Sequence, residues 1–520
     1  MIDAKNKDLI SNNADLKRRL FHYGFLITDA DDISEEDYPF YNNWQTDRIG
    51  DYNLFVSPSQ TYYIQPSPEG GTYVLIGHCM NPFNGTYLEQ EILTGLGTFG
   101  SGAFFDRINE LTGVFTLFYV KNTSISIVGD PCCIQTVYYG ILNQKIYVSS
   151  HDNLLGDLLG LERDTYVKKL CKYKFFHFFG SCLPGNLSQF AEFKRLVPNH
   201  FITICVDMIE VKRFYTPHTL EISENEIAER VSLLLSNTLE QIPKKFKRPA
   251  ISLSGGCDSK TTLSCCKEPR RYRLYSFISS DVERVDAIAA QKICKALHLD
   301  HQIYEIPFED QEIEGVEPIR YVLNHNNGEL VPCNANDVRK QAVFSAIDDF
   351  DVEVKSWCSE IGRAYYAKRF SKRSFGRITP RKCTTLYKVF FHNRRLVLQT
   401  DRVFKEYLKE YSVPETDRSL PWQEWFYWEY QKSSWNGVVI TGQHRFSHNI
   451  TIPYNNRLLL ELLLSAPFES RVHDTIYQMI RDSRNPMIDQ AVPTVVNVKH
   501  TARRAKMERA YYYFNTLLPF

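Results

Sequence analysis

The chain has 520 residues, of which 43% are hydrophobic, 13% aromatic and 23% charged. This composition excludes a disordered chain, and the length allows two or three domains with a large core. Lysine plus arginine and aspartate plus glutamate balance at 61 each, so no net charge draws the chain toward nucleic acid or a membrane surface.

The N-terminal segment lacks the apolar core of a signal peptide. No apolar run approaches the roughly 20 residues that are needed to cross a bilayer. The 13 cysteines are scattered, without CxxC or a Cys/His spacing typical of zinc sites. We therefore expect reduced thiols, no structural zinc and a cytoplasmic location.

The first part of the chain, residues 1–215, reads as short strands separated by turns. Its apolar, β-branched and aromatic runs are bounded by Gly, Asn and Asp, which is typical of strands. These runs cover residues 72–80, 113–120, 124–130, 145–150, 201–207 and 209–215. They predict stacked antiparallel sheets in a first domain over residues 1–215.

The period changes after the linker between Tyr215 and Ser223. Ser223 and Glu226 have capping-box spacing and open a predicted helix. Strands at 250–254, 273–279 and 301–307 then alternate with helices, which predicts a parallel sheet with crossover connections. In the helix predicted over 281–299, Val285, Ile288, Ala289, Ile293 and Leu297 form an apolar stripe. We expect a second α/β domain over residues 216–520, mainly helical from about residue 419.

The loop "SGGCDS", residues 254–259, follows the first of these strands. Gly255 and Gly256 allow positive φ and a close backbone approach, so that successive N–H groups can face one anion. The helix that follows adds its positive dipole end, and Ser254, Ser259 and Lys260 add donors. The loop therefore predicts a phosphate site.

Asp258 in this loop would repel a phosphate unless a Mg²⁺ ion lies between them, since Mg²⁺ binds carboxylate and phosphate oxygens together. The alternative is an ordinary tight turn in which Asp258 or Ser259 caps a helix. Five fixed positions make a chance match rare, which favours the phosphate site.

The loop is not a Walker A motif. It resembles the pyrophosphate loop of the N-type ATP pyrophosphatases, which cleave ATP between the α and β phosphates. Further segments at residues 113–140, 180–215 and 449–467 resemble, in order, those of the asparagine synthetases and β-lactam synthetases. The resemblance implies an amidotransferase-like (Ntn-type) first domain and a Rossmann-like ATP pyrophosphatase domain with a mainly helical end.

The chain departs from glutamine-dependent members of this family in the residues that would release ammonia from glutamine. Glutamine-dependent relatives use a cysteine at the mature N-terminus as nucleophile. Here Ile2 follows Met1 and the first cysteine is Cys79. We therefore expect no glutaminase, and a first domain that acts as a scaffold.

A second loop, in "VEVKSWCSEIGRAYY", resembles the family's other pyrophosphate-side loop, where relatives carry an acidic pair. Here Glu360, Gly362 and Arg363 stand in that region. Glu360 could be the second Mg²⁺ ligand and Arg363 could bind pyrophosphate, although the two could also form a local ion pair. The resemblance also implies that Lys499 touches phosphate, but a surface lysine is the alternative. Asn449 stands where synthetases carry a catalytic glutamate, and an amide cannot act as a general base.

The residues predicted to bind ATP share these two loops and the end of the strand before the first. They are Ser252, Leu253, Ser254, Gly255, Gly256, Cys257, Asp258, Ser259, Lys260 and Gly362. Asp258 and Glu360 are the predicted metal ligands, and Lys499 and Arg363 the predicted catalytic residues.

Three other segments have less specific readings. Residues 367–382 are basic with interleaved aromatics, which could indicate RNA, but a solvated insertion is favoured. A polar turn near His325 could line an acceptor pocket, and a turn alone is favoured. The aromatic run 422–430 has helical spacing and is expected in the core.

The hypothesis is an ATP- and Mg²⁺-dependent, AMP-forming ligase that adenylates a carboxylate and passes the acyl group to an amine. We expect small-molecule or peptide substrates, no membrane or nucleic-acid partner, and a chain that could pair with copies of itself. The alternatives are a nucleotide-binding scaffold that has lost catalysis and an RNA-modifying adenylating enzyme.

Overall fold

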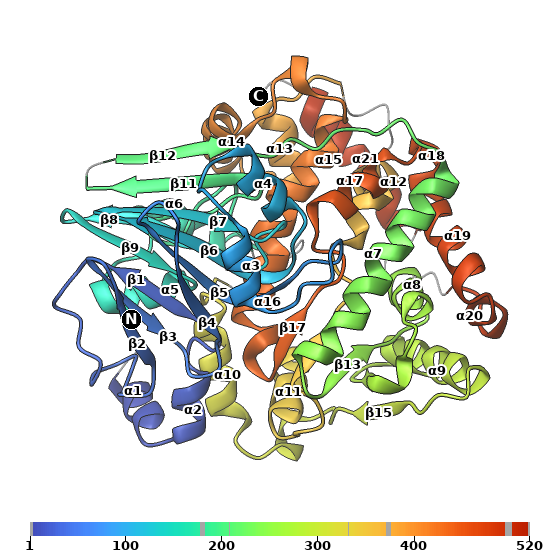
Figure 1. The fold of residues 1–520 in the computed structure, drawn as a ribbon, viewed down its shortest axis with the longest axis horizontal. Coiled ribbons are helices and arrows are strands. Elements are labelled where there is room, and N and C mark those ends of the chain that lie inside the picture. The colour runs from blue at the N-terminus through green and yellow to red at the C-terminus, as the bar shows by residue number, and fades with distance from the viewer. Residues whose placement is uncertain are drawn as a thin grey trace.

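The computed structural model describes residues 4–176, 182–206, 208–330, 332–370, 376–494 and 502–517. It is a mixed α/β structure with two antiparallel sheets and one parallel sheet. Figure 1 shows the antiparallel sheets, in blue to green, on the left, and the parallel sheet at the lower right. In the described ranges no helix combines the length and apolar character that a membrane crossing requires.

The two antiparallel sheets stack around a shared apolar core. Their strands are β1 (Phe25–Thr28), β2 (Gln45–Ile49), β3 (Tyr52–Val56), β4 (Tyr62–Pro66), β5 (Thr72–Met80), β6 (Thr112–Lys121), β7 (Ser124–Gly129), β8 (Tyr138–Leu142), β9 (Lys145–Ser149), β10 (Lys194–Arg195), β11 (His200–Cys205) and β12 (Met208–Arg213). One sheet has the order β10-β8-β9-β1-β3-β2 and the other β12-β11-β7-β6-β5-β4. Phe25 of β1 packs edge-on against Phe118 of β6 within one buried cluster. The predicted stacked antiparallel sheets are confirmed.

Short helices precede the first strand or lie between the strands in chain order. They are α1 (Ala4–Ser11), α2 (Ala14–Arg19), α3 (Glu89–Gly95), α4 (Gly102–Asn109), α5 (Asp152–Leu159) and α6 (Thr165–Cys171). A buried cluster on the outer face of the second sheet joins Phe104 of α4 to Tyr73 of β5. Both faces of that sheet are therefore covered.

The parallel sheet has its first strand at its centre. Its strands are β13 (Pro249–Ser252), β14 (Arg273–Ile278), β15 (Gln302–Glu305), β16 (Val352–Val354) and β17 (Asn449–Thr451), in the order β15-β14-β13-β16-β17. The chain moves outward from β13 through β14 to β15 and then returns to the other side of β13 with β16. The strand order therefore reverses between β13 and β16, which is where α/β sheets bind ligands.

The helices α7 (Glu224–Lys245), α8 (Cys257–Cys265) and α9 (Asp281–Ala296) pack on this sheet. The side chain of Ser223 caps α7 by accepting from the N–H of Glu226, as predicted. The stripe predicted on α9 is only partly correct. Ala289 and Ile293 are buried, but Val285 and Ile288 are 55% and 43% exposed, because α9 packs on the sheet through a narrower face than the sequence pattern offers.

The remainder of the described chain is mainly helical from residue 316 onward, whereas the sequence predicted this only from about residue 419. Its helices are α10 (Val316–Asn326), α11 (Ala335–Ser345), α12 (Tyr365–Phe370), α13 (Pro380–Tyr387), α14 (Arg394–Tyr411), α15 (Trp422–Phe426), the π-helix η6 (Tyr427–Gly437), α16 (Val438–Gly442), α17 (Arg457–Ser465), α18 (Phe468–His473), α19 (Thr475–Arg484), α20 (Met487–Ala491) and α21 (Ala502–Leu517). The aromatic side chains of residues 422–430 are buried, which confirms their core role.

Buried polar contacts join the two halves of the chain. Asn455 donates to Asp130 Oδ1 at 2.8 Å, and Arg457 donates to the Gly129 carbonyl at 3.1 Å. Arg213 of β12 pairs with Glu429 of η6 at 2.6 Å. The predicted boundary near residue 215 falls between β12 and α7 and stays a prediction, because apolar side chains from both halves share one buried cluster.

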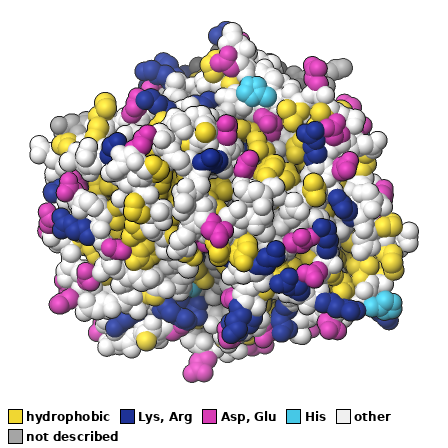
Figure 2. Space-filling view, in the orientation of Figure 1, with side chains coloured by type: hydrophobic (Ala, Val, Ile, Leu, Met, Phe, Trp, Pro, Cys, Tyr) yellow, Lys and Arg dark blue, Asp and Glu magenta, His cyan; other side chains and the backbone are white. Residues whose placement is uncertain are grey.

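Figure 2 shows basic and acidic side chains interspersed over the face drawn in Figure 1. Of the five basic side chains that the structure describes in segment 367–382, three are paired with carboxylates. Lys368 pairs with Asp474, Arg369 with Glu508 and Arg381 with Asp401. These pairs favour a structural role for the segment over an RNA surface.

Candidate functional site

The glycine loop lies at the reversal of the strand order. It leaves the carboxyl end of β13, and the loop after β16 faces it. The hydroxyls of Thr262 and Ser356, one from each side, are 2.7 Å apart. The two loops that the sequence singled out are therefore neighbours at the place where a parallel sheet of this topology binds ligands.

The loop is held by its own serines. Ser254 Oγ and Ser259 Oγ are 2.9 Å apart, and the Gly256 N–H donates to Ser254 Oγ at 3.2 Å. The Gly255 N–H donates to Asp286 Oδ1 at 3.3 Å. Gly256 has φ −76° and ψ 160°, so the expected positive φ is wrong at this residue. The loop is extended there, and its serine hydroxyls, rather than a left-handed turn, set its shape.

The N-terminus of α8 has no side-chain cap. Gly256 is the N-cap residue, and Asp258 is the second residue of the helix. An α-helix leaves its first N–H groups without intrahelical partners. The alternative reading, in which Asp258 or Ser259 caps an ordinary turn, is therefore wrong. The uncapped terminus keeps backbone donors and the positive dipole end available to an anion.

Asp258 is bound by protein donors on both of its oxygens. Arg363 NH1 donates to Oδ1 at 2.9 Å and to Oδ2 at 2.7 Å, and Ser359 Oγ donates to Oδ1 at 2.7 Å. Burial and the nearby Glu360 carboxylate raise the pKa of Asp258, against the opposing effect of Arg363. The local ion pair of Arg363 is formed with Asp258, not with Glu360.

Arg363 bridges two carboxylates. Its Nε and NH2 donate to Asp474 at 2.9 and 2.8 Å, and Lys368 Nζ lies 2.6 Å from the same carboxylate. Asp474 separates α18 from α19 with φ 59°, and Ala364 beside Arg363 has φ 46°. Left-handed backbone at non-glycine residues is strained and is concentrated at functional sites. Sequence reasoning missed Asp474, and its position before α19 carries no motif that could have revealed it.

Glu360 pairs with Lys432 of η6 at 2.9 Å, and the Lys432 side chain is 1% exposed. Burial opposes ionisation, but the Lys432 ammonium outweighs it and lowers the pKa of Glu360. π-Helical turns occur frequently at functional sites. Sequence reasoning missed Lys432 because it lies 72 residues from Glu360 along the chain.

Asp258 and Glu360 do not fit the magnesium site that the sequence predicted. Both predicted ligands, Asp258 and Glu360, are bound to cationic side chains of the protein. Within the described residues, no group of three or more His, Cys, Asp or Glu side chains could hold a metal ion. Arg363 lies between the carboxylates of Asp258 and Asp474 and binds both.

Several other predicted residues point away from the loop. Lys260 pairs with Asp489 and donates to the Val492 carbonyl at 2.7 Å, so its charge is directed toward α20. A Cβ at Gly362 would lie 2.6 Å from Leu463 Cβ, so this glycine allows α17 to pack closely.

The remaining residues that were predicted to bind ATP lie at the end of β13 and the start of α8. Leu253 and Cys257 are buried, and Ser252 ends β13. Burial raises the pKa of the Cys257 thiol. Lys499 lies outside the described residues, so its role stays a prediction. Of the predicted binding residues, Ser254, Asp258 and Ser259 therefore have side chains beside the uncapped N-terminus of α8.

Asn449 lies at the amino end of β17, paired in register with the first residue of β16. Its Oδ1 accepts from Arg445 at 3.1 Å and from the Ile450 N–H at 2.9 Å. The glycine loop leaves the opposite, carboxyl end of the sheet. The Asn449 side chain therefore bonds within its own segment of the chain, at the end of the sheet opposite the glycine loop. It does not replace a general base for the amine substrate.

The largest difference from sequence reasoning outside the loop is His325, which is buried rather than in a plain polar turn. Its Nε2 donates to Asp157 Oδ2 and its Nδ1 to Glu329 Oε1, both at 2.6 Å. Burial lowers the pKa of His325, but the two carboxylates outweigh it and raise the pKa to about 9. The cationic ring joins α10 to α5 of the first half.

We expect His325→Gln to destabilise the protein at pH 6 far more than at pH 9.5. A folded-state pKa above the ordinary 6.5 contributes stability that is complete below pH 6.5 and lost as the pH rises through about 9. The shift corresponds to about 3 kcal/mol. Thermal unfolding of both proteins at the two pH values measures the effect. His473→Gln, at a histidine 73% exposed, is the control. Equal destabilisation at both pH values would contradict a charged His325.

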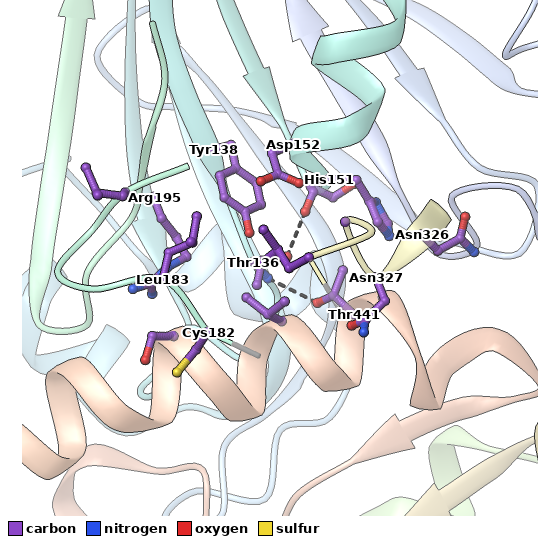
Figure 3. Close-up of a pocket in the computed structure, with 17 residues that line it drawn as sticks. Thr136, Tyr138, His151, Asp152, Cys182, Leu183, Arg195, Asn326, Asn327 and Thr441 are labelled. Carbon is purple, nitrogen blue, oxygen red and sulfur yellow. Dashed lines mark hydrogen bonds between the residues drawn. The ribbon is translucent and has the colours of Figure 1, made fainter. Parts of the chain in front are cut away.

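Figure 3 shows a cavity between the first antiparallel sheet and α16. Polar side chains, among them Tyr138, Asp152 and Arg195, line it, and its volume is about 20 Å³. A water molecule needs about 10–15 Å³ by the same measure. This cavity is therefore large enough for water and too small for an ATP-sized ligand.

No protein-family model matches the chain, and no curated protein matches its sequence. Among solved structures it is similar to glutamine phosphoribosylpyrophosphate amidotransferase from B. subtilis complexed with ADP and GMP, at 12% identity over 71% of this chain and 75% of that one, with TM-score 0.23. A structure of the allosteric regulatory enzyme of purine biosynthesis is 11% identical over 67% and 71%, with TM-score 0.24. Glutamine-dependent NAD⁺ synthetase from Acinetobacter baumannii in complex with ADP is 15% identical over 62% and 55%, with TM-score 0.20. Similarity at this level establishes neither the fold nor the function of this chain.

Proposed function

We propose that the chain is an ATP-dependent, amide-forming ligase of the asparagine-synthetase-like group. A substrate carboxylate attacks the α-phosphorus of ATP, which releases pyrophosphate and gives an acyl-adenylate. An amine then displaces AMP. The observation that carries the proposal is the uncapped N-terminus of α8 beside the Ser254–Ser259 loop, at the reversal of the strand order.

The protein's own groups bind and orient the departing pyrophosphate in this proposal. The first N–H groups of α8 and the hydroxyls of Ser254 and Ser259 would donate to phosphate oxygens. Arg363, anchored by Asp258 and Asp474, would supply positive charge beside them. The predicted magnesium ion has no part in this proposal, because the carboxylates assigned to it are bound to Arg363 and Lys432.

The proposal includes no glutaminase. Cys79 lies within β5 with an exposed fraction of 0%, and burial raises the pKa of its thiol. A buried, protonated thiol is a poor nucleophile. The amine is thus taken free or from the same substrate molecule, and the amidotransferase-like half would act as a scaffold. A cytoplasmic location and small-molecule or peptide substrates remain parts of the proposal.

We expect ATP to yield AMP and pyrophosphate when the correct carboxylate is present. The loop and helix would hold the β and γ phosphates as one leaving group, so the α–β bond breaks. A set of candidate acids is screened for pyrophosphate release, and the nucleotide products are separated by anion-exchange chromatography. Stoichiometric ADP in place of AMP would contradict the proposal.

A second candidate is a nucleotide-binding scaffold without catalysis. The bidentate bond of Arg363 to Asp258 favours it, because this carboxylate is then unavailable for chemistry. Tight ATP binding without turnover, across the whole set of acids, would favour the scaffold. Adenylation of RNA has less support, because three basic side chains of segment 367–382, those of Lys368, Arg369 and Arg381, are paired with carboxylates.

A further inference from the structure

Three carboxylates near the strand-order reversal, those of Asp258, Asp474 and Glu360, are paired with cations of the protein. Arg363 binds Asp258 and Asp474. Lys368 binds Asp474, and Lys432 binds Glu360. Three carboxylates and three cationic groups leave no negative charge among these residues that would attract a divalent ion.

The guanidinium group of Arg363 is fixed on two sides. One edge, Nε with NH2, binds both oxygens of Asp474 at 2.9 and 2.8 Å. The remaining nitrogen, NH1, binds both oxygens of Asp258 at 2.9 and 2.7 Å. Ser359 fixes Asp258 further. Two carboxylates therefore bind one planar cation with four hydrogen bonds, where a metal would require octahedral oxygen donors.

We propose that Arg363 is the resident cation of this site and that the site binds a pyrophosphate group without a divalent metal. The nature of the anion rests on the proposed function. The claim about the cation goes beyond it, because an AMP-forming ligase would ordinarily take its nucleotide with Mg²⁺. Arginine is suited to this role, since its charge does not depend on pH and its planar fork matches the carboxylate oxygens of Asp258 and Asp474.

The test is titration calorimetry with inorganic pyrophosphate, once in EDTA and once with excess Mg²⁺. We expect wild-type protein to bind pyrophosphate in EDTA at least as tightly as with excess Mg²⁺, because Mg²⁺ in solution also binds pyrophosphate oxygens and competes with a metal-free site. We expect Arg363→Gln to weaken binding in EDTA by about tenfold to a hundredfold, the range for losing a hydrogen bond to a charged group. Arg381→Gln is the matched control, because Arg381 binds Asp401 at 2.8 Å with similar exposure but lies on α13. That variant should bind like wild type.

Manganese binding, followed by electron paramagnetic resonance, tests the proposal without relying on a variant's folding. The Mn²⁺ signal of a mixture of Mn²⁺ and pyrophosphate should be the same with wild-type protein as without protein. Pyrophosphate binding only with Mg²⁺, or stoichiometric Mn²⁺ binding that Asp258→Asn removes, would overturn the proposal. Should Arg363→Gln fail to fold, Arg363→Lys keeps the charge and should weaken binding less. An absence of pyrophosphate binding in both buffers would overturn the proposed function itself, and this inference with it.

Discussion

Replacing Arg213 by methionine is expected to lower the free energy of unfolding by about 3–5 kcal/mol, the usual effect of breaking a buried ion pair. Glu429, its partner, has an exposed fraction of 0% and accepts from Arg213 at 2.6 and 2.8 Å. Without the arginine, the Glu429 carboxylate stays buried, with Asn199 of the first half donating to it at 3.0 Å. Guanidinium chloride unfolding followed by tryptophan fluorescence measures the change, since Trp428 is next to Glu429 in the chain.

Two further variants show whether the buried charge is the cause. Arg213→Met combined with Glu429→Gln should recover part of the loss, because the uncompensated charge is removed. Arg248→Met breaks a pair with Asp348 whose side chains are 39% and 88% exposed, and should lower the stability far less than Arg213→Met. If Arg213→Met and Arg248→Met had equal effects, the pair would not fasten β12 to η6 as described.

Replacing Gly256 by aspartate is expected to abolish ATP binding without harming the fold. At φ −76° and ψ 160°, position 256 suits an N-cap side chain, which would accept from the first N–H groups of α8. The new Cβ meets only Ser254 Oγ, at 3.2 Å. Stability should rise by a few tenths of a kcal/mol. A carboxylate in the phosphate position should reduce ATP affinity by at least about a hundredfold.

The comparison with Gly256→Ala separates charge from bulk. Alanine adds the Cβ but neither caps the helix nor carries charge, so ATP affinity should fall much less. Calorimetry gives the affinities, and thermal unfolding gives the stabilities. A Gly256→Asp protein that binds ATP like wild type would contradict the assignment of the phosphates to this terminus.

The sequence predicted those features that local pattern determines. Apolar, β-branched and aromatic runs bounded by Gly, Asn and Asp located β5, β7 and β9, and Ser223 marked the start of α7. The Ser254–Ser259 motif located the loop because a strand, two glycines and a helix start are consecutive in the chain. Such elements depend on neighbouring residues, whose preferences can be read directly.

Partners that arrive from distant segments could not be predicted. Asp258 was read as a metal ligand, whereas Arg363, 105 residues away, binds it. Asp474, between α18 and α19, and Lys432, in η6, carry the other charges of this cluster. Neither residue belongs to a recognisable sequence motif. His325 was read as part of a turn because its partner Asp157 lies 168 residues away. Long-range pairing of charges decides these roles, and a single sequence does not record it.

The central claim is that the Ser254–Ser259 loop and the first N–H groups of α8 hold the phosphates of ATP. Hydrogen–deuterium exchange with and without ATP tests it most directly, because binding should slow the exchange of those amides themselves. We predict that protection is greatest in peptides covering residues 254–260, and that Gly256→Asp removes it. ATP-dependent protection confined to other parts of the chain, with residues 254–260 unchanged, would contradict the claim.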